Sequence, residues 1–532
     1  MPSQEINIKQ NPTDRDKGFP KGTSKFQRRF FEIVPGFLTW ILLLLPFIFA
    51  LLGQYTLFVI YVSFIVAYWS VRTIKFITGI WIGTRRMKRD LALDWVEMCK
   101  KDNPQGYEKL KFIYLCPVYS EPYELLDKSF EAFSKNDVGA GKIDVVMAME
   151  QRKEDLQIEN FKRLKEKYGK LFNSMQYYIH PSGIPEEIVG VKGANINWAM
   201  RHHVEKMESE GKDIHDYLLV TCDSDLRPTP KYLSAIAYKY LTVSEPDNRY
   251  YATAIHSFNN NIWQAPHIIR IQSSMLTLVL LQNWVTHKKR RIPFTNEEVY
   301  VLDSFSSYVV NLKTLKDVQF WDPEIANDDT AFYWNAMVRT KGTFKSEEVY
   351  IPTHNDAVLN DSYVKSHQAF YKQQYRWGWG IVNAPITLSA IYQDKKFPLY
   401  RKLSMFGLIF EHNIWYLTIV FILTFGLQIM NIDKSFQFTA ISYNLPQLMS
   451  IIFTLITLSN IPIVIFRRMI TPIPKGWKWY RHLLDFIETL LITVNMLTFG
   501  FVPYIQAQTE MMLGLSKFKR NFYVTEKSAP KS

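Results

Sequence analysis

Uncharged apolar runs near both ends of the chain predict membrane-spanning helices. Two of these runs, 36–53 and 54–71, follow each other almost without interruption. Each is close to the length of about 17–25 residues that crosses the core of a bilayer. They predict a transmembrane hairpin at 36–72. Two further spans, from about 405 to 430 and from about 445 to 466, are predicted within a second membrane segment at 403–466.

A last apolar stretch, 489–507, is less uniform, because acidic residues and Pro503 lie within it or beside it. If it crossed the membrane, the basic tail at 517–532 would lie outside, against the usual distribution of Lys and Arg. We therefore expect 467–516 to form a basic loop and an interfacial helix, which gives four crossings. A re-entrant hairpin broken near Gly500 and Pro503 is one alternative, and an additional true span is another.

The charge of the chain predicts its orientation. There are 63 Lys and Arg residues against 50 Asp and Glu residues, a formal net charge of +13. Basic residues gather in the tail at 1–35 and just after the hairpin, whereas 431–444 contains one Lys and no Arg. By the positive-inside rule, the polar middle is cytoplasmic in a multi-pass protein of the cell membrane. Membrane lipids are expected partners, and nucleic acid is not, because the basic residues flank the spans.

The polar middle, 108–372, alternates short apolar runs with helical patterns. Runs at 111–119, 142–150 and 216–225 predict buried strands, and 124–134 predicts a helix. This alternation predicts an α/β domain with a mainly parallel sheet, inserted between the transmembrane helices. Ligands bind beyond the carboxyl ends of such strands. The residues found there are Tyr119, Glu121, Glu150, Asp223 and Asp225.

The segments beside this domain are expected to lie at the membrane surface. Residues 73–107 predict a linker or interfacial helix, and 373–402 predicts an interfacial helix. Aromatic residues make up 15% of the chain and charged residues 21%, which excludes a disordered protein. Three cysteines without a CxxC spacing exclude a disulfide scaffold and a zinc site, so we expect packed, reduced thiols.

Two acidic motifs are candidates for chemistry. Asp223 and Asp225 lie two residues apart on one side of an extended segment, where they can hold a divalent ion on a diphosphate; a solvated turn is the alternative. Asp328 and Asp329 are adjacent like charges, so one of them is expected to have a raised pKa suited to a general base. An acidic pair at a helix N-terminus explains the second motif equally well.

A third motif, Q-Q-Y-R-W at 373–377, lies just before the chain returns to the membrane. Arg376 offers a bidentate cation for phosphate, and Trp377 offers a flat surface for a sugar ring. Alone, such a pair at a membrane boundary is more often an interfacial anchor.

Taken together, these motifs resemble those of the membrane-integrated family 2 glycosyltransferases, the group that holds cellulose, chitin and hyaluronan synthases. The motifs D-S-D at 223–225, N-D-D at 327–329 and Q-Q-Y-R-W follow one another in that family's order. A fourth match, F-Y-V-T-E-K at 522–527, is similar to the FxVTxK gating loop of cellulose-synthase-like enzymes and would make 517–532 a gating-type tail. The resemblance covers roughly 108–527.

The resemblance implies a GT-A-like fold and an inverting, metal-dependent hexosyltransferase. Such an enzyme moves a sugar from a nucleotide-diphosphate sugar, with a UDP-sugar as the first expectation, to a growing glycan that it can also export. Asp223 and Asp225 would hold the diphosphate with Mg²⁺ or Mn²⁺, and Asp329 would be the catalytic base. The other nucleotide-sugar contacts implied are Tyr119, Glu121, Glu150, Lys192, Asn197, Arg376, Thr525 and Lys527. The acceptor contacts implied are Asp328, Gln373 and Trp377.

The chain departs from the family pattern at two places. The usual Asp-Asp-Gly turn after the second strand is replaced by Met149-Glu150-Gln151-Arg152, so Glu150 would contact the base and the base preference stays open. The acceptor loop at 304–307 is Ser-Phe-Ser-Ser rather than a Ser-Gly type.

Two other functions remain open. One is a non-processive glycosyltransferase that acts on a lipid acceptor. The other is a membrane transporter or channel with a cytoplasmic regulatory domain, suggested by Glu411 and His412 inside a predicted span.

Overall fold

A seven-stranded sheet forms the centre of the polar region. The computed structural model describes residues 15–515 except 17, 185–186, 188–189, 287–288, 292–297, 301, 303–305 and, between 430 and 459, all but 447, 450, 454, 457 and 458. The strand order is β13-β8-β12-β6-β3-β4-β5. The strands are β3 (Lys111–Val118), β4 (Ile143–Glu150), β5 (Ser174–His180), β6 (Tyr217–Thr221), β8 (Arg249–Thr253), β12 (Tyr308–Asn311) and β13 (Lys345–Val349).

The sheet is mixed but mainly parallel. β6, β3, β4 and β5 pair in parallel, with Leu115 of β3 opposite Val146 of β4 and Thr221 of β6. β12 lies antiparallel between β6 and β8, and β13 pairs in parallel with β8. The carboxyl ends of β3, β4 and β6 therefore meet at one edge. This architecture confirms the predicted α/β class.

Helices cover both faces of this sheet, which explains its continuous apolar strands. Side chains on alternate positions of β3 separate into two cores: Ile113 and Leu115 join one, whereas Phe112 and Tyr114 join the other. The helices of the domain are α3 (Trp95–Asp102), α4 (Pro104–Lys109), α5 (Tyr123–Ser134), α6 (Glu154–Tyr168), α7 (Lys192–Ser209), α8 (Tyr232–Thr242), α10 (Leu312–Asp317) and α11 (Asp328–Arg339).

Short strands extend the domain beyond this sheet. A three-stranded sheet, in the order β7-β14-β9, carries the segments that leave β6, β8 and β13. The short strands are β7 (Arg227–Pro228), β9 (His256–Ser257) and β14 (Thr353–His354), and two separate pairs are β1 (Arg15–Asp16) with β2 (Phe19–Pro20) and β10 (Lys289–Arg291) with β11 (Glu298–Tyr300). The three cysteines are buried and free, as expected from the sequence.

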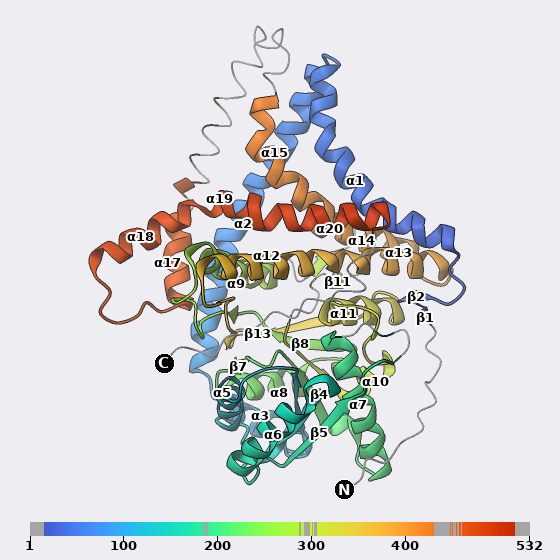
Figure 1. Cartoon of the computed structure of the whole chain (residues 1–532), viewed down its shortest axis with the longest axis vertical. Coiled ribbons are helices and arrows are strands. Elements are labelled where there is room, and N and C mark those ends of the chain that lie inside the picture. The colour runs from blue at the N-terminus through green and yellow to red at the C-terminus, as the bar shows by residue number, and fades with distance from the viewer. Residues whose placement is uncertain are drawn as a thin grey trace.

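Three helical stretches are long and apolar enough to cross a membrane, and they rise from one end of the sheet domain (Figure 1). They are α1 (Lys25–Leu51), α2 (Tyr55–Ala92) and Leu399–Gly426, which comprises α14 (Leu399–Phe410), a π-helical turn (Glu411–Trp415) and most of α15 (Tyr416–Ile429). The first two helices cover the predicted hairpin at 36–72, and both extend beyond it. Most of the predicted span at 445–466 lies outside the described residues; its end begins α17 (Asn460–Ile470).

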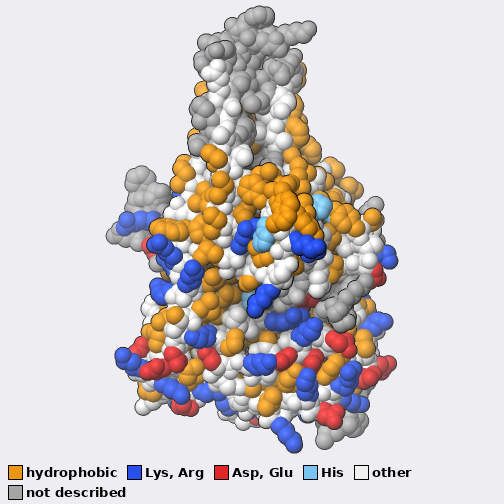
Figure 2. All heavy atoms as spheres, turned by 90° about the vertical axis from the view of Figure 1, so that its left-hand side faces the viewer, with side chains coloured by type: hydrophobic (Ala, Val, Ile, Leu, Met, Phe, Trp, Pro, Cys, Tyr) orange, Lys and Arg blue, Asp and Glu red, His pale blue; other side chains and the backbone are white. Residues whose placement is uncertain are grey.

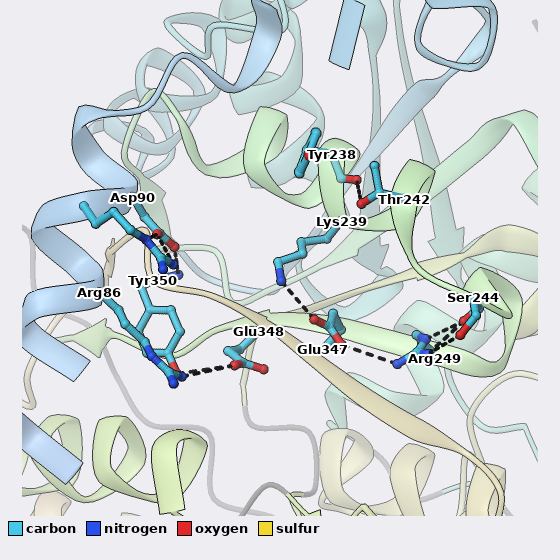
Figure 3. A network of polar contacts seen from close by, with 11 residues as sticks. Arg86, Asp90, Tyr238, Lys239, Thr242, Ser244, Arg249, Glu347, Glu348 and Tyr350 are labelled. Atoms are coloured by element: carbon cyan, nitrogen blue, oxygen red, sulfur yellow. Dashed lines mark hydrogen bonds and ion pairs between the residues drawn. The ribbon is translucent and has the colours of Figure 1, made fainter. Parts of the chain in front are cut away.

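The extension of α2 reaches the edge strand of the large sheet, so the first half of the predicted linker at 73–107 belongs to this helix. Figure 3 shows the contacts: Arg86 donates to the hydroxyl of Tyr350 at 2.7 Å, and Asp90 accepts from the Tyr350 backbone N–H at 3.3 Å. Next to them on β13, Glu347 lies between Lys239 of α8 and Arg249 of β8. A long apolar helix is thus tied by polar contacts to the domain core.

A layer of helices lies across the direction of α1 and α15, between them and the sheet (Figure 1). Its members are α9 (His267–Thr286), α12 (Tyr363–Gly378), α13 (Asn383–Gln393), α18 (Trp479–Leu490), α19 (Ile492–Asn495) and α20 (Val502–Leu513). The helical path continues through Gly500 and Pro503, by way of a π-helical turn at Met496–Phe501. α20 packs closely on α12, since a Cβ on Gly378 would lie 3.1 Å from the Cα of Tyr504.

Candidate functional site

A cavity of about 590 Å³ lies between the carboxyl ends of β3, β4 and β6 and the crossing helices. Its lining includes every site residue predicted from the sequence except Asn197, Thr525 and Lys527. The predicted residues that line it are Tyr119, Glu121, Glu150, Lys192, Asp223, Asp225, Asp328, Asp329, Gln373, Arg376 and Trp377. Segments that are far apart in the sequence, from β3 to α12, are thus brought to one place.

The three exceptions have different causes. Asn197 is buried on α7 and accepts a hydrogen bond from Arg201 Nε at 3.1 Å. The asparagine of this helix that lines the cavity is Asn195, which also donates to the backbone oxygen of Ala148 at 2.8 Å. Thr525 and Lys527, with the rest of the FxVTxK match, lie outside the described residues.

Asp223 and Asp225 follow β6 and meet different surroundings. Asp223 accepts from Ser306 Oγ at 2.8 Å, and its side chain is 35% exposed. Asp225 is 1% exposed, and its Oδ2 accepts the backbone N–H of Asp356 at 3.0 Å. One carboxylate therefore opens to the cavity while the other is anchored beneath it.

These two carboxylates fit a divalent ion that arrives with its ligand. Within the described part of the chain, no group of three or more His, Cys, Asp or Glu side chains could hold a metal ion. Hard oxygen donors such as Asp223 and Asp225 suit Mg²⁺ or Mn²⁺. Mg²⁺ is commonly held by only one or two carboxylates, with water and phosphate oxygens as the other ligands. The residues present fit such a shared site.

Lys192 occupies the centre of the acidic groups. Its Nζ lies 3.1 Å from Asp223 Oδ1 and 3.1 Å from Asp328 Oδ2. Burial alone would lower the pKa of Lys192, but the carboxylates of Asp223 and Asp328 outweigh it and hold the pKa well above its usual value. Burial raises the pKa of Asp328 to about 6, with Lys192 opposing the rise. Of the adjacent pair, Asp328 thus has the raised pKa.

Both carboxylate oxygens of Asp329 accept backbone hydrogen bonds at the start of α11. Its Oδ1 accepts the backbone N–H of Thr330 at 2.7 Å, and its Oδ2 accepts the backbone N–H of Ser306 at 2.7 Å. Asp328 and Asp329 both lie in the first turn of α11. Because the N-terminus of a helix favours negative charge, this position is a second, structural reason for the acidic pair. Ser306, in the left-handed region at φ 46°, contacts both Asp329 and Asp223. The sequence pattern marked it only as part of a loop.

Arg152 was missed from the sequence, although it lies at the same edge of the sheet. Its guanidinium is 4.4 Å from the ring centre of Tyr119, and its Nε donates to Glu150 Oε2 at 3.0 Å. Gly190, at φ 83°, makes room for it, since a Cβ there would lie 3.0 Å from Arg152 Nη2. Glu150 and Tyr119 are therefore linked by one cation. The only sequence signal for Arg152 was its position two residues after Glu150.

The other end of the cavity reaches the apolar helices. His412, Asn413 and Tyr416, from the third long helical stretch, line it together with Tyr504 and Gln508 of α20. Gln508 Nε2 donates to the backbone oxygen of Asn413 at 2.6 Å, which joins the two helices. The cavity thus runs from the carboxylates to side chains that the sequence places in or near the membrane.

Glu411, which suggested a transporter, is held by partners within the protein. The hydroxyl of Tyr68 donates to its Oε1 at 2.8 Å, and Arg72 lies 3.6 Å from the same oxygen. Its neighbour His412 lines the cavity. Glu411 thus makes a structural contact, whereas His412 forms part of the cavity wall.

The sheet, the acidic cavity at the strand ends and the apolar helices define an α/β domain joined to helices that are long and apolar enough to cross a membrane. The sequence profile of glycosyl transferase family group 2 matches residues 218–512, which is more than half of the chain. The chain belongs to this family. The prediction of a family 2 glycosyltransferase is confirmed.

Solved structures of distant glycosyltransferases are also similar to the chain. The mannosyltransferase PcManGT from Pyrobaculum calidifontis, in complex with GDP-Man and Mn²⁺, is 11% identical with a TM-score of 0.41, over 86% of this chain and 100% of that one. S. aureus TarS 1–349, in complex with UDP-GlcNAc, is 11% identical with a TM-score of 0.31, over 76% and 92%. No curated protein matches the chain.

Proposed function

We propose that the chain is an inverting, metal-dependent glycosyltransferase that moves a sugar from a nucleotide-diphosphate sugar to a growing glycan at the cytoplasmic membrane face. The observation that carries this proposal is the single cavity lined by Asp223, Asp225 and Asp329 and by Arg376 and Trp377 of α12. The groups proposed to bind donor, act as base and bind acceptor thus share one cavity within a family 2 glycosyltransferase.

Transfer proceeds in one displacement. Asp329 accepts the proton of the acceptor hydroxyl, whose oxygen forms a bond to the anomeric carbon while the bond from that carbon to the diphosphate breaks. The new bond forms on the face opposite the leaving group, so the configuration inverts. Asp223 and Asp225 would hold Mg²⁺ or Mn²⁺, and such an ion would neutralise charge on the diphosphate. Arg376 binds the phosphates, and Trp377 and Gln373 hold the acceptor sugar.

The membrane arrangement follows from the same proposal. α1, α2 and Leu399–Gly426 cross the cell membrane, and the sheet domain is cytoplasmic. The FxVTxK match lies outside the described residues and would contribute Thr525 and Lys527 to the diphosphate site. A growing glycan that leaves the cavity beside Tyr416 and Gln508 would pass between the apolar helices.

Purified full-length protein incubated with UDP- and GDP-sugars should release nucleoside diphosphate only when Mg²⁺ or Mn²⁺ is present. Asp225→Asn is expected to lower this release by about tenfold or more, because it removes one carboxylate charge from the ion site. Asp155→Asn, an exposed carboxylate on α6, is the matched control and should retain full activity. Equal release with and without a chelator would overturn the metal-dependent mechanism.

A non-processive enzyme with a lipid acceptor is the second candidate. Apolar side chains from α9 and the third long helical stretch line the same cavity, among them Leu276, Leu280 and Leu417, and they suit the acyl or prenyl part of such an acceptor. Product mass distinguishes the two candidates: a ladder of glycan lengths supports the first, and one lipid with a single added sugar supports the second.

Arg152→Ala is expected to raise the KM for the donor by about tenfold, which corresponds to roughly 1.4 kcal/mol, with little change in kcat. The substitution removes the cation that links Glu150 to the ring of Tyr119, where the base would bind. Steady-state kinetics with varied donor would measure the change. Arg163→Ala is the matched control, since Arg163 lies 3.7 Å from the ring centre of Tyr123, a residue that no site prediction includes. An unchanged KM would exclude Arg152 from the base site.

A further inference from the structure

Three consecutive asparagines begin two residues after β9 and belong to none of the motifs predicted from the sequence. They are Asn259, Asn260 and Asn261. In a surface turn, an Asn side chain commonly bonds to its own backbone two residues further on. Here each of the three side chains bonds instead to a segment that is distant in the sequence. We call these three residues the Asn bridge.

The middle asparagine holds the turn that carries Asp225. Asn260 Nδ2 donates to the backbone oxygen of Asp225 at 3.1 Å and to that of His354 at 3.4 Å. The carboxylate of Asp225 is held from the adjacent segment, because the backbone N–H of Asp356 donates to its Oδ2 at 3.0 Å. Asn260 is not among the described residues that line the cavity. It can therefore affect a bound ion only through the residues that it holds.

The two outer asparagines fix the bridge on both sides. Asn259 Nδ2 donates to the backbone oxygen of Ile470, the last residue of α17, at 2.9 Å, and its Oδ1 accepts from Thr471 Oγ1 at 2.9 Å. Asn261 Nδ2 donates to the backbone oxygen of Ala357 at 2.9 Å, and its Oδ1 accepts the N–H of the same residue at 2.7 Å. Both amide groups of each outer asparagine thus have a partner, so the backbone on either side of Asn260 is held.

The Asn bridge connects the sheet domain to one of the apolar helices. α17 begins within the predicted span at 445–466. It lies on the side of the molecule that Figure 2 shows, where hydrophobic side chains gather higher up and charged side chains lower down. A path of two hydrogen bonds and one peptide link therefore runs from the end of α17 to Asp225.

We propose that Asn260 is a positioning residue for the divalent ion, acting through Asp225, and that Asn259 connects this position to α17. The inference rests on the proposed function, in which Asp223 and Asp225 would hold the ion. Asn260 holds the backbone of Asp225 while Asp356 holds its carboxylate, so the two bonds together set where this carboxylate lies. Residues that orient metal ligands without touching the metal commonly change its affinity by about 10- to 100-fold.

The test measures Mn²⁺ binding by the full-length protein in detergent. The EPR signal of free Mn²⁺ is followed during titration in the presence of UDP and, separately, of GDP. Asn260→Leu keeps the approximate volume of the side chain and loses its donor, so it should raise the Mn²⁺ dissociation constant by about tenfold. Asn260→Ala, the second variant, should agree. Asn259→Ala should raise the constant by more than the roughly twofold scatter between independent sites.

Asn248→Leu is the matched control. Asn248 directly precedes β8, and its Nδ2 donates to the backbone oxygen of Thr343 at 3.1 Å. This is the same kind of bond, and it lies at the end of β8 opposite to the end from which the chain continues to the Asn bridge. Its loss should leave the Mn²⁺ dissociation constant within about twofold of the parent value. A change in Asn260→Leu could then not be ascribed to a general loss of stability.

Each contrary outcome overturns a stated part of the proposal. Equal Mn²⁺ affinity in Asn260→Leu and the parent, or equal weakening in Asn248→Leu, would overturn the positioning role. Unchanged affinity in Asn259→Ala would overturn the connection to α17. A parent protein that binds no Mn²⁺ with either nucleotide would instead overturn the ion site of the proposed function, and this inference with it. Because binding is read without turnover, a failure of sugar transfer alone would remain distinguishable.

Discussion

Asp329→Asn should lower the rate of sugar transfer by about three orders of magnitude, near the middle of the range known for general bases. The carboxylate oxygens of Asp329 accept the backbone N–H groups of Ser306 and Thr330, each at 2.7 Å. The amide keeps the shape of the side chain but loses the charge that takes up the proton. Its NH₂ group would also face one of these two N–H donors. Nucleoside diphosphate release, measured with saturating donor, would report the loss.

Binding of the donor should survive in Asp329→Asn, because the groups proposed to hold the diphosphate are unchanged. A donor dissociation constant within about twofold of the parent would separate loss of the base from loss of the site. Asp317→Asn is the matched control: this carboxylate ends α10 and is 58% exposed. Turnover at the parental rate in Asp329→Asn would show that another group accepts the proton.

Much of the sheet could be predicted because its central strands are buried on both faces. β3, β4 and β6 are continuous apolar runs, and each ends at a residue that lines the cavity or just before one. β12 could not be predicted in this way. Tyr308–Asn311 is only four residues long, and its place between β6 and β8 depends on antiparallel pairing with both. Nothing in so short a run specifies its partners.

The end of α2 was misplaced because hydropathy and helicity are different properties. The apolar run ends before Arg72, where the predicted span stops, yet the helix continues to Ala92. Lys and Arg are good helix formers, and Arg86 and Asp90 gain partners on the sheet. The change in polarity therefore marked the end of the apolar run without marking the end of the helix.

The acidic part of the site could be predicted because its residues follow strands or begin a helix. Asn195 lines the cavity and the predicted Asn197 does not, because an α-helix turns by about 100° per residue and two residues that lie two positions apart face different sides. Tyr504 and Gln508 carried no local signal. They reach the cavity because α20 packs against α12, some 130 positions earlier in the chain.

Lys192→Met should destabilise the protein by about 3 kcal/mol, the lower end of the cost of leaving a buried charge without its partner. Asp328, whose side chain is 6% exposed, and Asp223 both lie 3.1 Å from the ammonium. Without the ammonium, the pKa of Asp328 should rise above its present value of about 6. The variant should therefore carry a protonated Asp328 at neutral pH and a lower Tm in detergent.

The pH dependence of the Lys192→Met deficit gives a second, independent measurement. A folded-state pKa above the ordinary value of 3.8 means that an ionised Asp328 destabilises the fold as the pH rises through about 6. Below that pH Asp328 is neutral with or without Lys192, so the deficit in Tm should be smaller at pH 5 than at pH 8. Lys192→Arg keeps the charge and should lose little stability at either pH. A deficit of equal size at both values would show that Lys192 acts by packing alone and not through the charge of Asp328.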